Sequence, residues 1–218
     1  SGVRTPRAAI EQLLALLQSQ APQAILFIDE TYREAGYGDE AIPESLAALH
    51  PRIVTGASVS KALGAPGLRT GWLTVPDADL RARLVVARMN TVISGSVLDE
   101  ALATALLRHR EPVLAPRRRL LAEGLAALAA WCEAERERIE WIRPDGGALC
   151  CLRLRADRFD DAAVSRFWDL LPRHELQLAS GAWFGESERV FRLGFGYLPP
   201  DRLAPALSAL STVLDAAA

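Results

Sequence analysis

The sequence contains few cysteine and histidine residues. Its 218 residues include three cysteines and three histidines. Cys132 stands alone, and Cys150 and Cys151 are adjacent in an apolar run without metal-site spacing, so we expect reduced core cysteines of a cytoplasmic protein. The histidines are isolated near expected loops or helix ends, and we expect them on the surface. The sequence therefore predicts no metal site.

Long apolar runs and a strong net charge are also absent. No run reaches the length of a membrane-spanning helix, and no signal-peptide pattern is present. With a net charge of −2, the chain carries no broad basic field that would attract nucleic acid or an anionic membrane. The one dense basic run, Arg117–Arg119, lies in a helical pattern beside two leucines, and we interpret it as a solvated helix face.

The first half of the sequence alternates short apolar segments with helical patterns. Strands are predicted at residues 24–30, 51–58 and 71–76. Helices are predicted at about residues 6–20, 77–89 and 98–108. This alternation indicates an α/β sheet that binds ligands at the carboxyl ends of its strands. Since nothing precedes the first helix to bury it, we expect the chain to begin within a larger domain.

After about residue 111 the pattern changes to a mixture of helices and hairpin-like strands. A long helix, bent at Pro116, is followed by strands predicted at residues 137–142, 148–154, 175–179 and 189–195. Further helices are predicted at about residues 160–171 and after residue 201. The sequence therefore predicts two domains, residues 1–111 and a smaller α+β domain at residues 112–218.

Residues 58–72, SVSKALGAPGLRTGW, combine an amine, a guanidinium and two serine hydroxyls on one glycine-rich stretch. Lys61 lies among small and apolar residues, where a charge that serves only solubility is unexpected. Arg69 suits a phosphate group because its guanidinium can donate paired hydrogen bonds. Ser58 and Ser60 add hydroxyl donors to the same stretch.

A second pair of polar residues, Asp29 and Tyr32, follows the first predicted strand in the sequence DETY. A turn there can direct both side chains into one crevice. Together with Lys61 and Arg69, they supply the groups that pyridoxal 5′-phosphate requires. These are a lysine for its aldehyde, a carboxylate for its ring nitrogen, a hydroxyl for its phenolic oxygen and a cation for its phosphate. The sequence therefore predicts this cofactor.

These motifs resemble those of the class I/II aminotransferases, which are fold-type I pyridoxal-phosphate enzymes. The lysine stretch matches S-x-S-K-A-L-G-x-P-G-L-R-x-G-W, and the D-x-x-Y motif lies upstream at the family's spacing. Weaker matches follow the family's order at Ser1-Gly2, 144–147 (P-x-G-G), 180–185 (P-G-x-x-F-G) and 191–195. The resemblance implies part of the large mixed-sheet α/β domain of that fold, plus a smaller C-terminal α+β domain.

The resemblance also implies a role for each residue that would contact the cofactor ring. Lys61 would be the Schiff-base lysine and the acid/base at the substrate Cα. Asp29 would pair with the pyridinium nitrogen. Tyr32 would donate a hydrogen bond to the ring oxygen.

Other residues would hold the phosphate and the substrate. The resemblance implies that Ser58 and Arg69 bind the phosphate, with Ser60 as a further candidate. Arg192 would bind the substrate α-carboxylate as a bidentate pair.

The sequence departs from the family's pattern in three respects. Leu149 replaces the usual aromatic residue after P-x-G-G, and Ser180 replaces the proline of P-G-x-x-F-G. The N-terminal third of the family's chain is absent, and it supplies the aromatic that stacks on the ring and backbone donors to the phosphate. We therefore expect this chain to bind the cofactor poorly by itself.

The shared cofactor machinery does not select the reaction, so three hypotheses stay open. The chain is similar to the arginine-acting enzymes of actinobacterial peptide-antibiotic pathways that lead to enduracididine or capreomycidine. That similarity implies oxygen-dependent oxidation or hydroxylation of L-arginine. A conventional aminotransferase and a non-catalytic sensor module of a regulator are the alternatives. The family further implies a homodimer with its sites at the interface.

Overall fold

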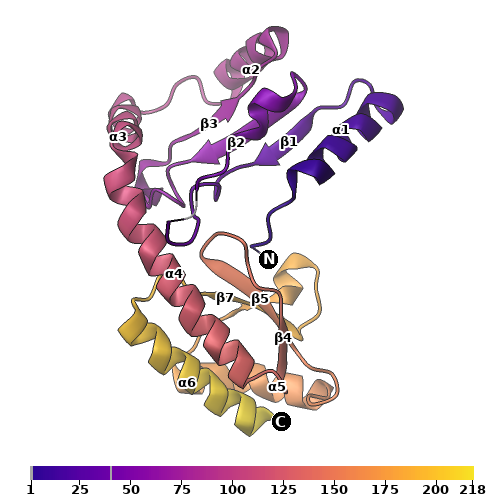
Figure 1. Ribbon diagram of the computed structural model, residues 1–218, viewed down its shortest axis with the longest axis vertical. Coiled ribbons are helices and arrows are strands. Elements are labelled where there is room, and N and C mark those ends of the chain that lie inside the picture. Colours follow the sequence, from indigo (N-terminus) through magenta and orange to yellow (C-terminus); the bar gives the residue numbers. More distant parts are fainter. Residues whose placement is uncertain (1, 40) are drawn as a thin grey trace. The chain divides into compact units, whose positions relative to one another are not determined.

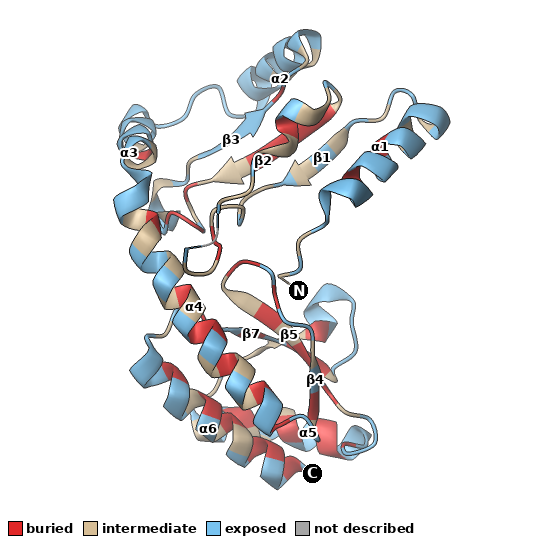
Figure 2. Ribbon diagram, viewed as in Figure 1, coloured by how far each residue is buried: buried red, intermediate tan, exposed pale blue. Residues whose placement is uncertain are grey.

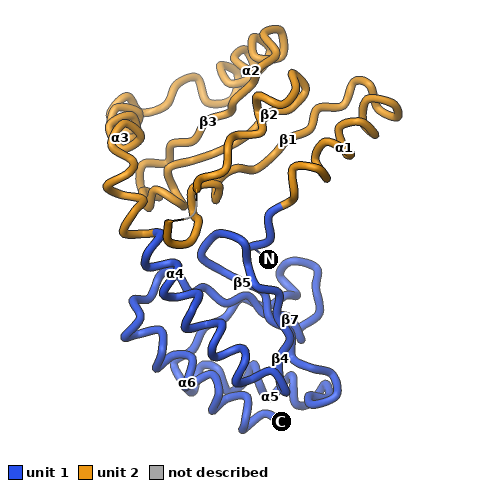
Figure 3. Tube along the Cα trace, viewed as in Figure 1, with its two compact units in different colours: residues 1–4, 118–218 blue, residues 5–117 orange. Residues whose placement is uncertain are grey.

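The computed structural model describes residues 2–39 and 41–218, which form two compact units (Figure 3). One unit comprises Thr5–Arg117, and the other comprises Arg118–Ala218 together with the residues up to Arg4. The division falls within one long helix, a few residues after the predicted domain boundary. The two domains stay a prediction, because a domain is a part that can fold independently, and a compact shape does not test independent folding.

The unit of residues 5–117 is built on a three-stranded mixed sheet. Its elements are α1 (Arg7–Gln20), β1 (Leu26–Asp29), η1 (Leu46–Leu49), β2 (Ile53–Ser58), η2 (Pro66–Leu68), β3 (Gly71–Thr74), α2 (Ala78–Thr91) and α3 (Val97–Arg108). The strand order is β1-β2-β3, with β1 and β2 parallel and β2 and β3 antiparallel (Figure 1). The predicted strands and helices of this half are confirmed, with small shifts at their ends.

Helix α1 packs against one face of this sheet. Ile10 and Leu14 of α1 form a buried cluster with Ile53 of β2. Leu26 and Ile28 of β1 pack against that cluster. Because side chains alternate along a strand, the residues between them project from the other face.

That other face, and two of the helices, leave apolar side chains exposed. Phe27 of β1 is 57% exposed and Leu73 of β3 is 51% exposed. Helix α2 buries no residue and α3 buries Ala103 alone, so both are coloured mainly as exposed in Figure 2. Exposed apolar patches of this kind mark surfaces that bind protein, a membrane or a ligand.

The second unit is built on a four-stranded antiparallel sheet. Helix α4 (Arg110–Ala134) begins in the first unit and continues into this one. The other elements are β4 (Ile139–Trp141), β5 (Leu149–Leu154), α5 (Asp161–Leu170), η3 (Leu171–His174), β6 (Ala179–Ser180), η4 (Gly181–Phe184), β7 (Val190–Gly194) and α6 (Pro200–Ala217). The strand order is β4-β5-β7-β6.

One predicted strand of this unit is largely wrong. The sequence predicts a strand at residues 175–179, but β6 covers only Ala179–Ser180. The 3₁₀-helix η3 precedes it and is followed by its C-cap residue Glu175, whose φ of 56° is left-handed. A residue in that conformation cannot continue a strand, so pairing with β7 begins later.

The core of this unit contains large aromatic side chains and two thiols. Phe167 and Phe191 are fully buried. Cys132 and Cys150 are buried and free, as predicted, and Cys151 is half-buried. Burial raises the pKa of both buried thiols, that of Cys150 to about 12, so they stay protonated near neutral pH and are poor nucleophiles.

A buried carboxylate links the end of α4 to α6. Glu135 is 5% exposed, accepts a hydrogen bond from Ser211 Oγ at 2.5 Å and pairs with Arg138 Nε at 2.7 Å. Trp131 Nε1 donates to the same Ser211 oxygen at 2.8 Å. The carboxylate needs these partners because an unpaired buried charge is strongly destabilising.

Replacing Glu135 by alanine is expected to lower the free energy of unfolding by about 2–3 kcal/mol, because Arg138 and Ser211 lose a shared acceptor. Urea unfolding followed by circular dichroism measures this change. Glu133→Ala is the control, because the Glu133 side chain is 74% exposed where it pairs with Arg136. Its expected change is below about 0.5 kcal/mol. Equal losses in both variants would contradict a structural role for the buried network.

Candidate functional site

The sheet of the first unit places two predicted site residues on one face at its edge. Asp29, the last residue of β1, pairs in register with Gly56 of β2. Ser58, the last residue of β2, lies two positions beyond Gly56, so both side chains project from the same face. Gly71 begins β3 directly opposite Ser58. The ends of β1 and β2 and the start of β3 therefore lie at the same edge, and this face is opposite the one that α1 covers.

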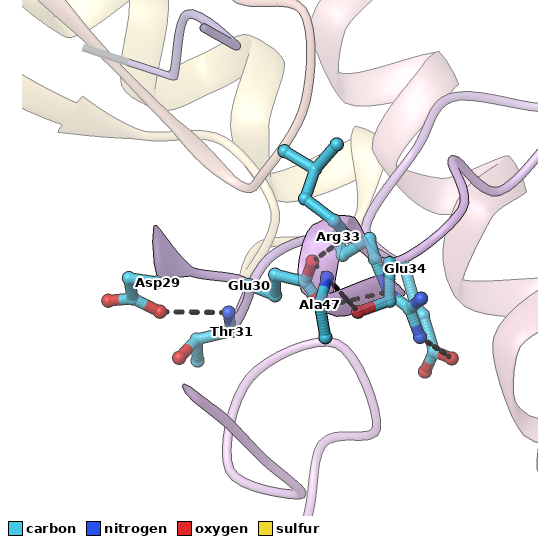
Figure 4. Close-up of polar contacts among 8 residues, drawn as sticks. Asp29, Glu30, Thr31, Arg33, Glu34 and Ala47 are labelled. Carbon is cyan, nitrogen blue, oxygen red and sulfur yellow. Dashed lines mark hydrogen bonds and ion pairs between the residues drawn. The ribbon is translucent and has the colours of Figure 1, made fainter. Parts of the chain in front are cut away.

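The two carboxylates after β1 point in different directions (Figure 4). Oδ1 of Asp29 accepts the Thr31 N–H at 2.9 Å, which leaves the second oxygen for a ligand. Glu30 instead accepts hydrogen bonds from Ser45 Oγ at 3.1 Å and from the Leu46 N–H at 2.8 Å. It thereby caps the start of η1. Asp29 is thus the carboxylate that faces outward at the sheet edge, while Glu30 has a structural role.

Tyr32 lies in the turn that leaves the same strand. Its carbonyl accepts the Ala35 N–H at 3.0 Å, which closes the turn. The Tyr32 side chain is 37% exposed. The turn therefore carries a phenol out of the sheet edge within three residues of Asp29, as the D-x-x-Y spacing predicts.

Lys61 lies in a tight turn whose neighbouring side chains are buried. The Gly64 N–H donates to the Lys61 carbonyl at 3.0 Å and closes the turn. Val59, Ala62 and Leu63 are between 0% and 7% exposed, whereas Lys61 is exposed. The buried neighbours anchor the turn, so the lysine side chain projects from a fixed base.

Lys61 is also the only lysine of the chain, among 25 lysine and arginine residues. This count is a signal that the sequence alone contains and that the motifs do not show. Arginine cannot replace lysine in bonding to an aldehyde, because the guanidinium keeps its protons. A chain that uses arginine for every other basic side chain keeps an amine at this one position.

The phosphate candidates lie on either side of the Lys61 turn. Ser58 Oγ accepts the Ser60 N–H at 3.3 Å, and both serines are half-buried. Arg69 is exposed, and its Nη1 donates to the Pro66 carbonyl at 3.0 Å, which leaves other N–H groups free to donate. The φ of Arg69 is 47°, in the left-handed region that a residue with a side chain seldom adopts. Strained backbone of this kind concentrates at functional sites.

Arg192 belongs to the other unit and lies on the outward face of β7. Its register partners are Cys151 on β5 and Ala179 on β6. Its guanidinium lies over the ring of Phe184, 4.8 Å from the ring centre. Phe184 ends η4, within the stretch that resembles P-G-x-x-F-G. The motifs at residues 180–185 and 191–195 contain Phe184 and Arg192, but the sequence does not predict their contact because a loop separates the two motifs.

Two further motifs of the resemblance lie together in that unit. Gly2 accepts hydrogen bonds from the N–H groups of Asp145 and Gly146 at 2.9 and 3.2 Å, in the P-x-G-G turn. Gly2 has a φ of 79°, and a side chain there would lie 2.6 Å from Pro144 Cβ. The motif therefore requires glycine at this position. Ser1, the other half of the predicted motif, lies outside the described residues.

Arg117 of the basic run is exposed, as the predicted solvated face requires, but it also makes a contact that the pattern did not predict. Its Nε donates to the carbonyl of Ala62 at 2.9 Å, directly beside Lys61. Arg119 is exposed, in agreement with the predicted solvated face. No periodic pattern could have identified Arg117, because the bond joins segments 55 residues apart.

The donor groups at the sheet edge fit a phosphorylated pyridine aldehyde. They comprise a carboxylate, a phenol, an amine, two hydroxyls and a guanidinium, carried by the ends of adjacent strands. Within the part of the chain that the structure describes, no three metal-ligating side chains come together. In the same residues, no helix has the length and apolar character needed to cross a membrane.

Known proteins resemble this chain over most of its length. A family model described as aminotransferase class I and II matches residues 1–210. Capreomycidine synthase of Streptomyces vinaceus is 30% identical over 209 residues, covering 96% of this chain and 51% of its own. The arginine–pyruvate transaminase of Pseudomonas aeruginosa is 30% identical over 194 residues, covering 86% of this chain and 46% of its own.

The solved structures include a PLP-dependent aminotransferase from Streptococcus suis with a TM-score of 0.86 and 26% identity. The match covers 99% of this chain and 55% of that one. The chain therefore spans about half the length of the proteins it resembles.

Proposed function

The chain belongs to the class I and II aminotransferase family of pyridoxal-phosphate-dependent enzymes and shares their fold, and we propose that the whole protein acts on the α-amino group and Cα of L-arginine. The sheet register supports the cofactor-binding part of this proposal. It sets Asp29 and Ser58 on one face at the strand ends, where the turn with Lys61 and the loop with Arg69 follow.

The residues at the sheet edge have separate proposed roles, some on the cofactor ring and one at the substrate Cα. Pyridoxal 5′-phosphate, when bound, draws electrons from the substrate Cα and makes loss of its proton easier. Asp29 would keep a proton on the ring nitrogen, and Tyr32 would donate a hydrogen bond to the ring oxygen. Lys61 would hold the aldehyde and would act as the acid/base for the proton at Cα.

Charged and hydroxyl side chains would hold the two anionic groups, which are the cofactor phosphate and the substrate α-carboxylate. Arg69 and Ser58 bind the phosphate, and Ser60 adds a further donor. Arg192 binds the substrate α-carboxylate as a bidentate pair, with its guanidinium backed by Phe184.

Arginine is proposed as the substrate, and oxygen as the oxidant. The similarity to an arginine–pyruvate transaminase supports arginine. The similarity to capreomycidine synthase supports a role in making a peptide-antibiotic precursor. In the proposed reaction, arginine, O2 and water give the 2-oxo acid, ammonia and hydrogen peroxide. Two electrons pass from the Cα–N unit to oxygen.

A conventional aminotransferase is the second candidate, favoured by the same transaminase relative. It would pass the amino group of arginine to a 2-oxo acid such as pyruvate and would consume no oxygen. The two reactions share the proton transfer by Lys61 and differ in what accepts the electrons and in where the amino group goes.

Oxygen uptake by the full-length protein with L-arginine separates these reactions. Without any 2-oxo acid, we expect oxygen uptake with release of ammonia and peroxide. Amino transfer to pyruvate or 2-oxoglutarate without oxygen uptake would overturn the oxidation and support the aminotransferase. Cofactor binding without either reaction, on arginine and on other amino acids, would instead support the sensor module.

We also propose that the full-length protein is a cytoplasmic homodimer that binds neither nucleic acid nor membranes. Support comes from the apolar side chains exposed on and after α2, such as Met89 at 62% and Ile93 at 79%. The balanced net charge of −2 supports the lack of nucleic-acid binding. Sedimentation of the full-length protein at several concentrations tests the dimer, and a monomer at all of them would refute it.

A further inference from the structure

A backbone carbonyl in the turn that carries Lys61 accepts a hydrogen bond from a distant residue. Within the turn, the Gly64 N–H donates to the carbonyl of Lys61 at 3.0 Å. The next carbonyl, that of Ala62, accepts a hydrogen bond from Nε of Arg117 at 2.9 Å. Arg117 therefore binds the backbone one residue after the lysine.

The guanidinium of Arg117 also fills the space beside Gly64. A side chain at position 64 would lie 2.4 Å from Nη1 and 2.7 Å from Cζ of Arg117. Gly64 has a φ of 67°, which suits glycine for a second reason. Gly64 and Arg117 therefore depend on each other, since the missing side chain of Gly64 leaves the space that the Arg117 guanidinium occupies.

Arg117 projects from a helix that is itself held in place. Leu114 lies one helical turn earlier on the same side of α4 and is 1% exposed. On the other side of the contact, Ala62 and Leu63 are buried. The hydrogen bond therefore joins two packed segments and restrains the turn.

We propose that Arg117 is a positioning residue that fixes the orientation of the Lys61 turn. This inference rests on the proposed role of Lys61 as the amine that binds the cofactor and moves the Cα proton. Arg117 acts through the backbone of Ala62 and not on the substrate. A small rotation of the turn would be magnified along the lysine side chain, and a displacement of about 1 Å can cost about 10²-fold in rate.

Hydrogen exchange tests the structural half of this proposal without any assumption about chemistry. In the full-length protein, Arg117→Ala is expected to speed exchange of the Gly64 amide about tenfold, because the turn loses a charge-assisted hydrogen bond. Arg117→Lys, which keeps a cationic donor, is expected to restore part of the protection. Arg119→Ala is the control, since Arg119 lies two positions later on α4 and therefore on a different side of the helix. Unchanged exchange in Arg117→Ala, or equal acceleration in the control, would overturn the proposal.

Kinetics of the same variants test the functional half. Arg117→Ala is expected to lower kcat about 10- to 100-fold and to change KM for the amino acid by less than about threefold. This split is expected because substrate binding is assigned to Arg192. Faster exchange at Gly64 with unchanged kcat would overturn the positioning role. If wild-type protein binds no cofactor and has no activity, the proposed function fails, and the exchange result still shows whether Arg117 holds the turn.

Discussion

Lys61→Ala is expected to abolish the yellow colour of the cofactor bound to the full-length protein. It is also expected to reduce kcat by roughly 10²- to 10⁴-fold or more, because the variant lacks both the amine that binds the aldehyde and the acid/base at Cα. Absorbance spectra of the purified protein and single-turnover rates measure the two effects. The effect is the largest expected here because no neighbouring group can replace an amine.

The composition of the chain allows a sharper form of this experiment. Reduction of the coloured protein with borohydride fixes the cofactor to its lysine, and peptide mapping then locates the label. Lys61 is the only lysine of these 218 residues, so the label is expected on this residue alone within the chain. Lys61→Arg is the matched variant, since it keeps the positive charge but cannot form the bond. Colour that persists in either variant would show that Lys61 does not bind the cofactor.

Much of the fold could be predicted from local patterns. Strands β1, β2 and β3 are short apolar runs bounded by turn residues, which is why their positions in the chain could be predicted. The candidate site at their edge could be predicted too, because Asp29 and the Lys61 turn follow directly from strand ends. These are features that a chain encodes within about ten residues.

The remainder depends on contacts between distant segments. The strand predicted at residues 175–179 is replaced by η3 and a short β6, because Glu175 takes a left-handed conformation that its own sequence does not demand. The role of Arg117 depends on where α4 lies against Ala62. A periodic pattern can identify a basic helix face, but it cannot say which arginine on that face binds a carbonyl.

The site of this chain is open, and the exposed sheet face explains why. Asp29, Lys61 and Arg69 are exposed, and so are the neighbouring apolar side chains of Phe27 and Leu73. Electrostatic interactions at such a surface are weak because water screens them. We therefore expect full cofactor affinity only in the full-length protein, whose relatives are about twice as long.

Arg192→Leu is expected to lower kcat/KM for L-arginine by roughly 10²- to 10³-fold, since removal of one member of a close charge pair costs about 2–5 kcal/mol. The main change is expected in KM, because the α-carboxylate is present in both the ground state and the transition state. Arg192→Lys is expected to recover only part of the loss, because a lysine cannot form the paired hydrogen bonds. Phe184→Leu keeps the apolar volume but removes the ring face under the guanidinium, so a smaller loss is expected.

The decarboxylated analogue of arginine separates loss of this contact from a general disturbance of the fold. Its affinity is measured by competition with L-arginine in wild-type protein and in Arg192→Leu. Wild-type protein is expected to prefer arginine strongly, and the variant is expected to bind the two compounds about equally, because only the carboxylate contacts Arg192. A preference that survives in the variant would place the carboxylate elsewhere. Equal weakening of both compounds would mean that Arg192 supports the structure of β7 and not the substrate.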